Sequence, residues 1–348
     1  MAFMGDRARL SGPGSLQDAG VGVAAPTRQP GEEALASLAG RYGLRPSAAR
    51  PRLFAYLEQL WQRRHFILAF ATARNIAMYT EARLGQAWQV LTPLLNAGVY
   101  YLIFGVIFEA KRGIANYIAF LVAGVFIFSF TDRSISVGSR VMGDNMSLIR
   151  ALHFPRACLP LAYVVVELQQ LLLSMVVLLA IVLGTGEPIT GYWLLVIVAL
   201  LLQTMFNVGA ALIMARIGAR VRDVSQLVPF LLRTWRYFCG VMYSITALPT
   251  AIPHWAKEIL AANPAAVYIS LTRMALMSSE RANDPGAKPY DAAKCALFNK
   301  QRLPPLQAYC HPIISMSQVW LFAVGWALVA VAIGVVYFWR AEARYGRG

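Results

Sequence analysis

Charged residues interrupt segments of this sequence that are otherwise apolar. Asp132 and Arg133 lie inside one such segment, and Arg233 and Arg236 lie inside a later one. A charge at the centre of a membrane helix costs about 2.5–3.5 kcal/mol, so each of these side chains should face a partner or water instead of lipid. Because guanidinium groups bind phosphate through paired hydrogen bonds, the two arginines are candidate ligands for an anionic group.

Two interpretations of the buried polar residues stay open. In the first, they line a polar path, in which aromatic rings stack on sugars beside the arginines. The candidate path residues are Asn96, Tyr100, Ser129, Asp132, Arg133, Arg233, Trp235, Arg236 and Tyr237. In the second, polar residues only join helices, for example through an ion pair between Asp132 and Arg233, and the aromatics belong to an interfacial belt. We favour the first for Arg233 and Arg236, and the second for Asn96, Glu167 and Gln170.

Motifs for catalysis are absent from the sequence. It contains no GxxxxGK[ST] phosphate loop and no HExxH, GxSxG or CxxC pattern. Its histidines, at positions 65, 153, 254 and 311, are too scattered to suggest a metal site. We therefore expect no catalytic residue, metal or cofactor in this chain.

The elements that must position the polar residues are membrane spans. Hydrophobic residues make up 58% of the 348 positions and charged residues only 14%, against roughly half and a quarter in soluble proteins. A helix needs about 20 mostly apolar residues to cross a bilayer. We predict an all-α membrane protein with six transmembrane helices, at 89–108, 117–139, 159–183, 192–214, 226–247 and 318–339.

The distribution of arginine predicts the orientation of these spans. Arginines cluster before span one, between spans two and three, between spans four and five, and after span six. The positive-inside rule places all four regions in the cytoplasm. We therefore expect a multi-pass protein of the inner (cytoplasmic) membrane with both termini cytoplasmic, and we attribute the net charge of +15 to this bias and not to nucleic-acid binding.

Regions outside the spans have their own character. Residues 1–52 predict a disordered cytoplasmic tail, and 340–348 form a second, short one. Residues 53–72 predict an interfacial amphipathic helix, with a soluble helix packed on a partner as the alternative.

The connection before the last span predicts two extracytoplasmic parts. Residues 251–279 suggest short helices that return to the membrane surface, and 280–315 suggest a loop insertion. This loop holds Cys295 and Cys310, which an oxidising compartment would let pair, although the sequence fixes no distance between them.

Short motifs recur at defined places relative to the spans. They are Arg83-Leu84-Gly85-Gln86-Ala87-Trp88 with Leu91, Pro93 and Leu94 at span one; Asn145, Leu148, Ile149, Phe154-Pro155-Arg156 and Leu159-Pro160-Leu161 between spans two and three; Arg222-Asp223-Val224 before span five; and Asn263-Pro264 before span six. In this order they resemble type 2 ABC exporter permeases of the polysaccharide and teichoic acid group, over about residues 53–279 and 318–339. The Asp132-Arg133 pair departs from the mostly aromatic and apolar pattern expected there.

The resemblance implies partners and a cargo. It implies a homodimer with two copies of a separate ABC ATPase subunit, which would bind ATP and Mg. The cargo would be a cell-surface glycopolymer on a polyprenyl diphosphate lipid, such as teichoic acid or O-antigen. The cytoplasmic connection between spans two and three would couple to the ATPase, through Asn145, Leu148, Ile149, Arg150, Phe154, Pro155 and Arg156.

Three other functions are alternatives. An exporter of small molecules or drugs would share the same fold. A membrane-embedded lipid-modifying enzyme should show a carboxylate or histidine constellation at one membrane face, and none is convincing here. A passive channel or scaffold would have no nucleotide-binding partner.

Overall fold

The structure is a computed structural model that describes residues 52–80, 83–108, 114, 116–151, 154–245, 248, 252–278, 280 and 316–342. Within these ranges all regular elements are helices and there is no strand. Five helices are long and apolar enough to cross a membrane, and a sixth crossing is added if one bent pair counts as a span. This confirms the predicted all-α membrane fold.

The five long helices lie close to their predicted positions. They are α4 (Trp88–Tyr100) continued by the π-helical segment η2 (Tyr101–Ile107), α5 (Tyr117–Asp144), α7 (Cys158–Gly184), α8 (Leu194–Arg220) preceded by the short η3 (Gly191–Trp193), and α15 (Met316–Trp339). Each is an apolar run that exceeds the length needed to span the hydrocarbon.

The helix at the fifth predicted span is shorter than predicted. α9 (Val224–Phe238) has 15 residues, or about 22 Å at 1.5 Å per residue, against the ~30 Å of a bilayer core. It ends because Gly240 adopts φ +63°, a conformation that favours glycine and stops a helix. The residues after Gly240 therefore do not continue the predicted span.

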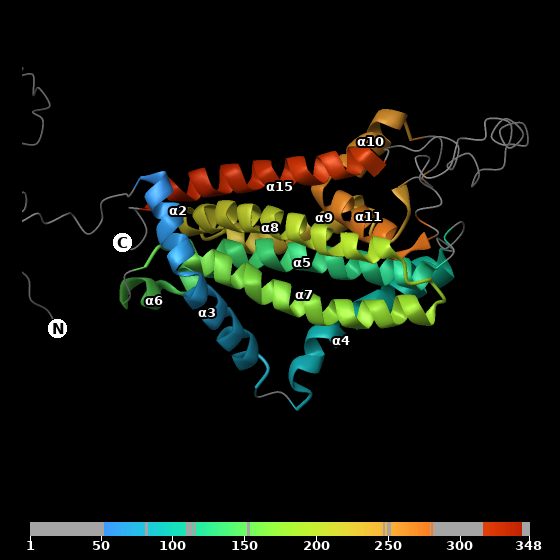
Figure 1. The fold of residues 1–348 in the computed structure, drawn as a ribbon, viewed down its shortest axis with the longest axis horizontal. Helices are drawn as coiled ribbons and strands as arrows, with labels where there is room; N and C mark the ends of the chain where they lie inside the picture. The colour runs from blue at the N-terminus through green and yellow to red at the C-terminus, as the bar shows by residue number, and fades with distance from the viewer. Residues whose placement is uncertain are drawn as a thin grey trace, which may run out of the picture. The chain divides into compact units, whose positions relative to one another are not determined.

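The next two helices form a bent pair. α10 (His254–Ala262) and α11 (Pro264–Leu276) meet at 78°. Asn263 accepts a hydrogen bond from the Ala265 N–H, and Pro264 occupies the first turn, so the sequence starts a new helix at the bend. Both helices lie at the end of the bundle opposite α2, α3 and α6 (Figure 1), so the pair enters and leaves at one end.

α11 lies inside the bundle, whereas short helices at the membrane surface were expected. Tyr268 is fully buried and donates a hydrogen bond to the Ala323 carbonyl of α15 at 3.0 Å. α11 also packs against α5 and α8. α11 therefore forms part of the core, whereas α10 has Trp255 and Ile259 exposed.

α5 is the centre of the bundle. Figure 1 shows it running between α7 and α8, and it also contacts α4, α9 and α11. Its residues from Ala119 to Phe128 are all buried. A close approach of two glycines, Gly209 on α8 and Gly334 on α15, joins the last span to this core, because a Cβ at either position would collide with backbone of the other helix.

The opposite end of the bundle carries three short helices: α2 (Leu53–Gln62), α3 (Arg64–Ala77) and α6 (Met146–Ala151). A three-residue turn, η1 (Gly85–Ala87), leads from α3 into α4. Phe54 and Trp61 of α2 are exposed at 85% and 70%, as an apolar face resting on a membrane would be. The interfacial position of 53–72 stays a prediction.

Some predictions concern residues outside the described ranges. They are the tail up to residue 51, the loop 281–315 with Cys295 and Cys310, and residues 343–348.

Candidate functional site

Three candidate path residues meet where α4, α5 and α9 adjoin. Nη2 of Arg236 lies 2.9 Å from Oδ2 of Asp132, and Nη1 donates to the Tyr100 hydroxyl at 2.8 Å. The guanidinium also lies 5.1 Å from the centre of the Phe128 ring. One arginine therefore ties three helices together, and the aromatic face adds to its stabilisation.

The ion pair uses a different arginine from the one considered in the sequence. Asp132 pairs with Arg236 and not with Arg233. The reason is the position of each arginine around the helix. Val228 and Leu232 are the buried residues of α9. Arg236, four residues after Leu232, lies on the same face, whereas Arg233, one residue after it, points about 100° away.

Arg233 is an exposed side chain in the middle of α9. Within the described part of the chain it makes no hydrogen bond or ion pair. Asn96 of α4 is also exposed. A hydrogen bond from Arg236 to Tyr100 links α9 to α4. Asn96 lies about one turn before Tyr100, and Arg233 lies about one turn before Arg236. The exposed surface around these two polar residues is otherwise largely apolar, with Leu95 and Val99 on α4 and Phe230 and Leu231 on α9.

The aromatic residues beside the arginines occupy two environments. Trp235 packs edge-on against Phe128, with ring centres 5.8 Å apart, and its Nε1–H donates to Oδ1 of Asn263 at 3.1 Å. This contact connects α9 to the tip of the bent pair. Tyr237 is exposed, whereas Trp235 is partly buried.

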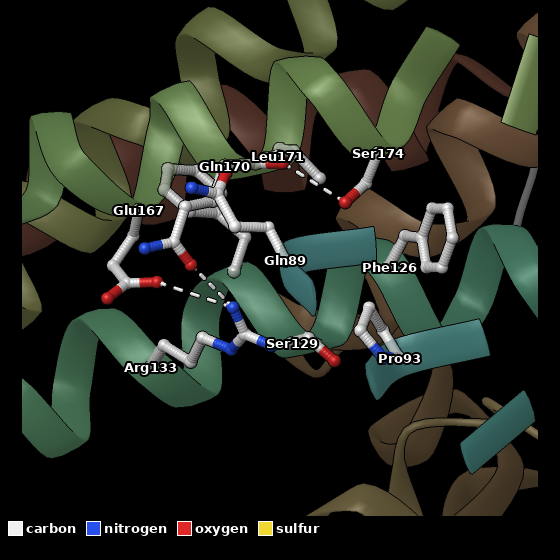
Figure 2. Close-up of a pocket in the computed structure, with 10 residues that line it drawn as sticks. Gln89, Pro93, Phe126, Ser129, Arg133, Glu167, Gln170, Leu171 and Ser174 are labelled. Atoms are coloured by element: carbon white, nitrogen blue, oxygen red, sulfur yellow. Dashed lines mark hydrogen bonds and ion pairs between the residues drawn. The ribbon is translucent and has the colours of Figure 1, made fainter. Parts of the chain in front are cut away.

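Arg133 and Ser129 lie on another side of α5, around a small pocket between α4, α5 and α7 (Figure 2). Nη1 of Arg133 donates to Oε1 of Gln170 at 2.6 Å and lies 4.0 Å from Oε2 of Glu167. The pocket is lined by Gln89, Pro93, Phe126, Ser129, Phe130, Arg133, Glu167, Gln170, Leu171 and Ser174. The space inside it that a water molecule's centre can occupy is about 20 Å³, enough for about one water.

The predicted path residues therefore fall into two groups. Tyr100, Asp132, Trp235 and Arg236 come together at the α4–α5–α9 contact, next to exposed Asn96, Arg233 and Tyr237. Ser129 and Arg133 do not join them. Asp132 and Arg133 diverge because adjacent residues of a helix point about 100° apart.

The predicted coupling segment folds over the end of α5. Nδ2 of Asn145 donates to the Val141 carbonyl at 2.8 Å, and Ile149 is buried in an apolar cluster with Tyr163. Leu148 and Phe154 pack against the same cluster, and the Phe154 ring lies 5.5 Å from that of Phe66. Arg150 is exposed, and Pro155 accepts a bond from the Cys158 N–H at the start of α7. One face of the segment therefore packs against the bundle, and the other face, with Arg150, is exposed.

Sequence reasoning missed Glu342 and Tyr56, which bind this segment. Glu342 accepts hydrogen bonds from the Tyr56 hydroxyl at 2.8 Å and from the Arg156 N–H at 2.9 Å. Burial raises the pKa of the Glu342 carboxyl above its ordinary value, and the bonds from Arg156 and Tyr56 partly offset this. An acidic residue within an otherwise basic tail after the last span was the available signal.

Arg273 of α11 was also missed. It is buried, and its three guanidinium nitrogens donate to the carbonyls of Phe120, Gly240 and Val241 at 3.1, 2.9 and 2.8 Å. It therefore fixes α11 to the start of α5 and to the turn after α9. The sequence did not predict this role, because Arg273 lies in a segment that was expected at the membrane surface.

No group of three His, Cys, Asp or Glu side chains in the described ranges could hold a metal ion.

Comparison with known proteins identifies relatives of the chain. The family described as ABC-2 type transporter matches residues 66–277. The O-antigen export system permease protein RfbA of Myxococcus xanthus is 27% identical over 192 residues, which is 55% of this chain and 73% of that protein. Two proteins of the same name from Klebsiella pneumoniae are each 27% identical, over 186 and 215 residues, covering 53% and 61% of this chain and 71% and 80% of theirs.

Proposed function

Because the chain belongs to the ABC-2 type transporter family and is a permease of such an exporter, we propose that its cargo is a cell-surface glycopolymer carried on a polyprenyl diphosphate lipid. The names of the relatives, which export O-antigen, support this class of cargo. O-antigen and teichoic acid are both polymers of this class. The chain itself is the transport subunit.

The exposed side of α4 and α9 carries the proposal. Asn96 lies there within a membrane-length helix, and Arg233 lies on the short helix α9 packed against α5; an arginine facing lipid within the bilayer core would cost several kcal/mol. A second copy of the chain, related by a two-fold axis, would place the same surface opposite itself. The space between the two copies would then present Arg233 and Asn96 to a cargo among apolar side chains such as Phe230 and Leu231.

The two arginines have different roles in this arrangement. Arg236 is neutralised by Asp132 and holds α9 against α5 and α4. Arg233 retains its charge on the exposed face and can bind the diphosphate or an anionic polymer through paired hydrogen bonds. Exposed Tyr237, one turn further along α9, offers a ring on which a sugar can stack.

Energy for transport comes from a partner. Two copies of a separate ATPase subunit, which binds ATP and Mg, would dock on the segment from Asn145 to Arg156. In this arrangement that segment, α2 and α3 would lie in the cytoplasm, and we propose the same side for both termini, as the arginine distribution predicts. Movement of the ATPase pair would then displace the bundles as rigid bodies, and no bond is made or broken by this chain.

The test is the ATPase activity of the purified complex with and without lipid-linked glycopolymer from the source cell. Stimulation by this lipid is the expected result. An ATPase activity that the lipid does not stimulate but small amphiphiles do would support the small-molecule exporter instead. Recovery of the chain without any ATPase would contradict the proposal.

A further inference from the structure

Glu342, three residues after the end of α15, joins segments that are far apart in the sequence. Its carboxylate accepts from the hydroxyl of Tyr56 on α2 and from the backbone N–H of Arg156. Its backbone carbonyl accepts from Nη1 of Arg156. The Tyr56 hydroxyl in turn accepts from the Ala157 N–H at 3.3 Å. We call Tyr56, Arg156, Ala157 and Glu342 the Glu342 junction.

The junction supplies hydrogen bonds that the start of α7 does not supply for itself. α7 begins at Cys158 with Ala157 as its N-cap, whose side chain cannot accept a hydrogen bond. The N–H groups of Cys158 and Leu159 bond back to the carbonyls of Pro155 and Arg156. The carboxylate of Glu342 and the hydroxyl of Tyr56 accept from two backbone N–H groups just before the helix. A negative charge at a helix N-terminus is also electrostatically favourable.

The junction rests on an apolar base that limits independent movement. Tyr56 and Ala157 are each 2% exposed, and Phe338 in the last turn of α15 is fully buried. These three share one apolar cluster with Ile149 of the coupling segment. Hydrogen bonds shielded from water in this way are stronger than exposed ones.

We propose that Glu342 is a positioning residue that makes the coupling segment, the last span and helix α2 move as one body when the ATPase displaces the segment. The inference rests on the proposed function, since it takes the segment from Asn145 to Arg156 as the ATPase contact. Without Glu342 the turn before α7 would yield locally, and ATP hydrolysis would continue with less displacement of the spans. Glu342 therefore affects the amount of cargo moved for each ATP.

The experiment measures polymer exported per ATP hydrolysed by the full complex in proteoliposomes, with lipid-linked glycopolymer from the source cell. Glu342→Ala should lower this ratio about fivefold or more, a typical coupling effect, while the ATPase rate changes by about twofold or less. Glu342→Gln keeps one acceptor oxygen, so its ratio of polymer exported per ATP should lie between those of Glu342→Ala and the wild type. Glu58→Ala removes an exposed acid from the same helix as Tyr56 and should match wild type.

A rescue separates positioning from a general loss of stability. In a background with the four native cysteines replaced by alanine, Tyr56→Cys with Glu342→Cys should be uncoupled, and a short thiol cross-linker should restore the ratio. A cross-linked protein that stays uncoupled or stops exporting would overturn the proposal, because the two segments would then have to separate during transport.

The outcomes distinguish this inference from the proposed function. An unchanged ratio in Glu342→Ala, or export and ATPase activity that fall in parallel, overturns the positioning role alone. A wild-type chain that binds no ATPase overturns the proposed function and this role with it.

Discussion

Asp132 and Arg236 form an ion pair of 2.9 Å between α5 and α9, and the same arginine donates to Tyr100 of α4. The pair leaves Arg233, on the adjoining face of α9, as an exposed charge. The proposed function gives these neighbouring arginines separate roles, structural for Arg236 and cargo-binding for Arg233, which mutations can test separately.

Removing one member of the pair should destabilise the protein more than removing both. Asp132→Asn or Arg236→Gln leaves a charge without its partner inside the bundle, which costs up to about 3 kcal/mol. The double variant leaves two neutral amides that can bond each other. Thermal unfolding of the three variants in detergent measures this coupling, and purely additive effects would show that the pair contributes nothing.

Loss of Arg233 should impair cargo binding without harm to the fold. Arg233→Ala removes hydrogen bonds to a charged group, and each such bond contributes about 1.5–3 kcal/mol. The concentration of lipid-linked glycopolymer that gives half-maximal ATPase stimulation should therefore rise about tenfold or more. Arg233→Lys should recover part of the affinity, because lysine keeps the charge but not the paired geometry. The control is Arg220→Ala, which removes an exposed arginine from the end of α8. An unchanged Arg233→Ala response would exclude the cargo role.

The buried Arg273 should not tolerate lysine. Lys cannot reach three carbonyls from two backbone segments at once, and each buried carbonyl left unbonded costs about 1–3 kcal/mol. Arg273→Lys should therefore lower the unfolding temperature and increase proteolysis after Gly240, where the turn loses two of its bonds. Arg220→Lys is the matched exposed exchange. Equal stability of the two variants would contradict this role of Arg273.

Two glycines of α15 should respond differently to alanine. Gly334→Ala places a methyl group against the backbone of Gly209, whereas nothing lies within 4 Å of the corresponding position at Gly325. Overpacking of this kind costs about 1–3 kcal/mol. Unfolding temperatures should fall for Gly334→Ala only, and a similar fall for Gly325→Ala would point to helix backbone effects instead of contact.

The long spans could be predicted from the sequence because each is an apolar run bounded by polar residues. The run 226–247 is less apolar than the other spans because it holds Arg233 and Arg236, and its helix ends at Phe238 because Gly240 turns the chain and Arg273 binds the carbonyls of the turn. That arginine lies over 30 residues away along the chain. Hydropathy does not register such a contact.

The candidate site was only partly predictable for a similar reason. The residue types were identified, but the choice between Arg233 and Arg236 depends on which face of α9 packs on α5, through Val228 and Leu232. Glu342 contacts a residue 186 positions away, and periodicity within one segment carries no information about such a pair.

The shortness of α9 has a consequence for how the protein is made. A 15-residue helix that carries two arginines, each unfavourable by about 2.5–3.5 kcal/mol at mid-membrane, is a poor substrate for insertion by the translocon on its own. α5, which supplies Asp132 for one of those arginines, is synthesised first. We therefore expect α9 and the bent pair behind it to enter the bilayer only against an already inserted α5, so biogenesis of this protein should proceed through an intermediate in which α4, α5, α7 and α8 are inserted before α9 and the bent pair.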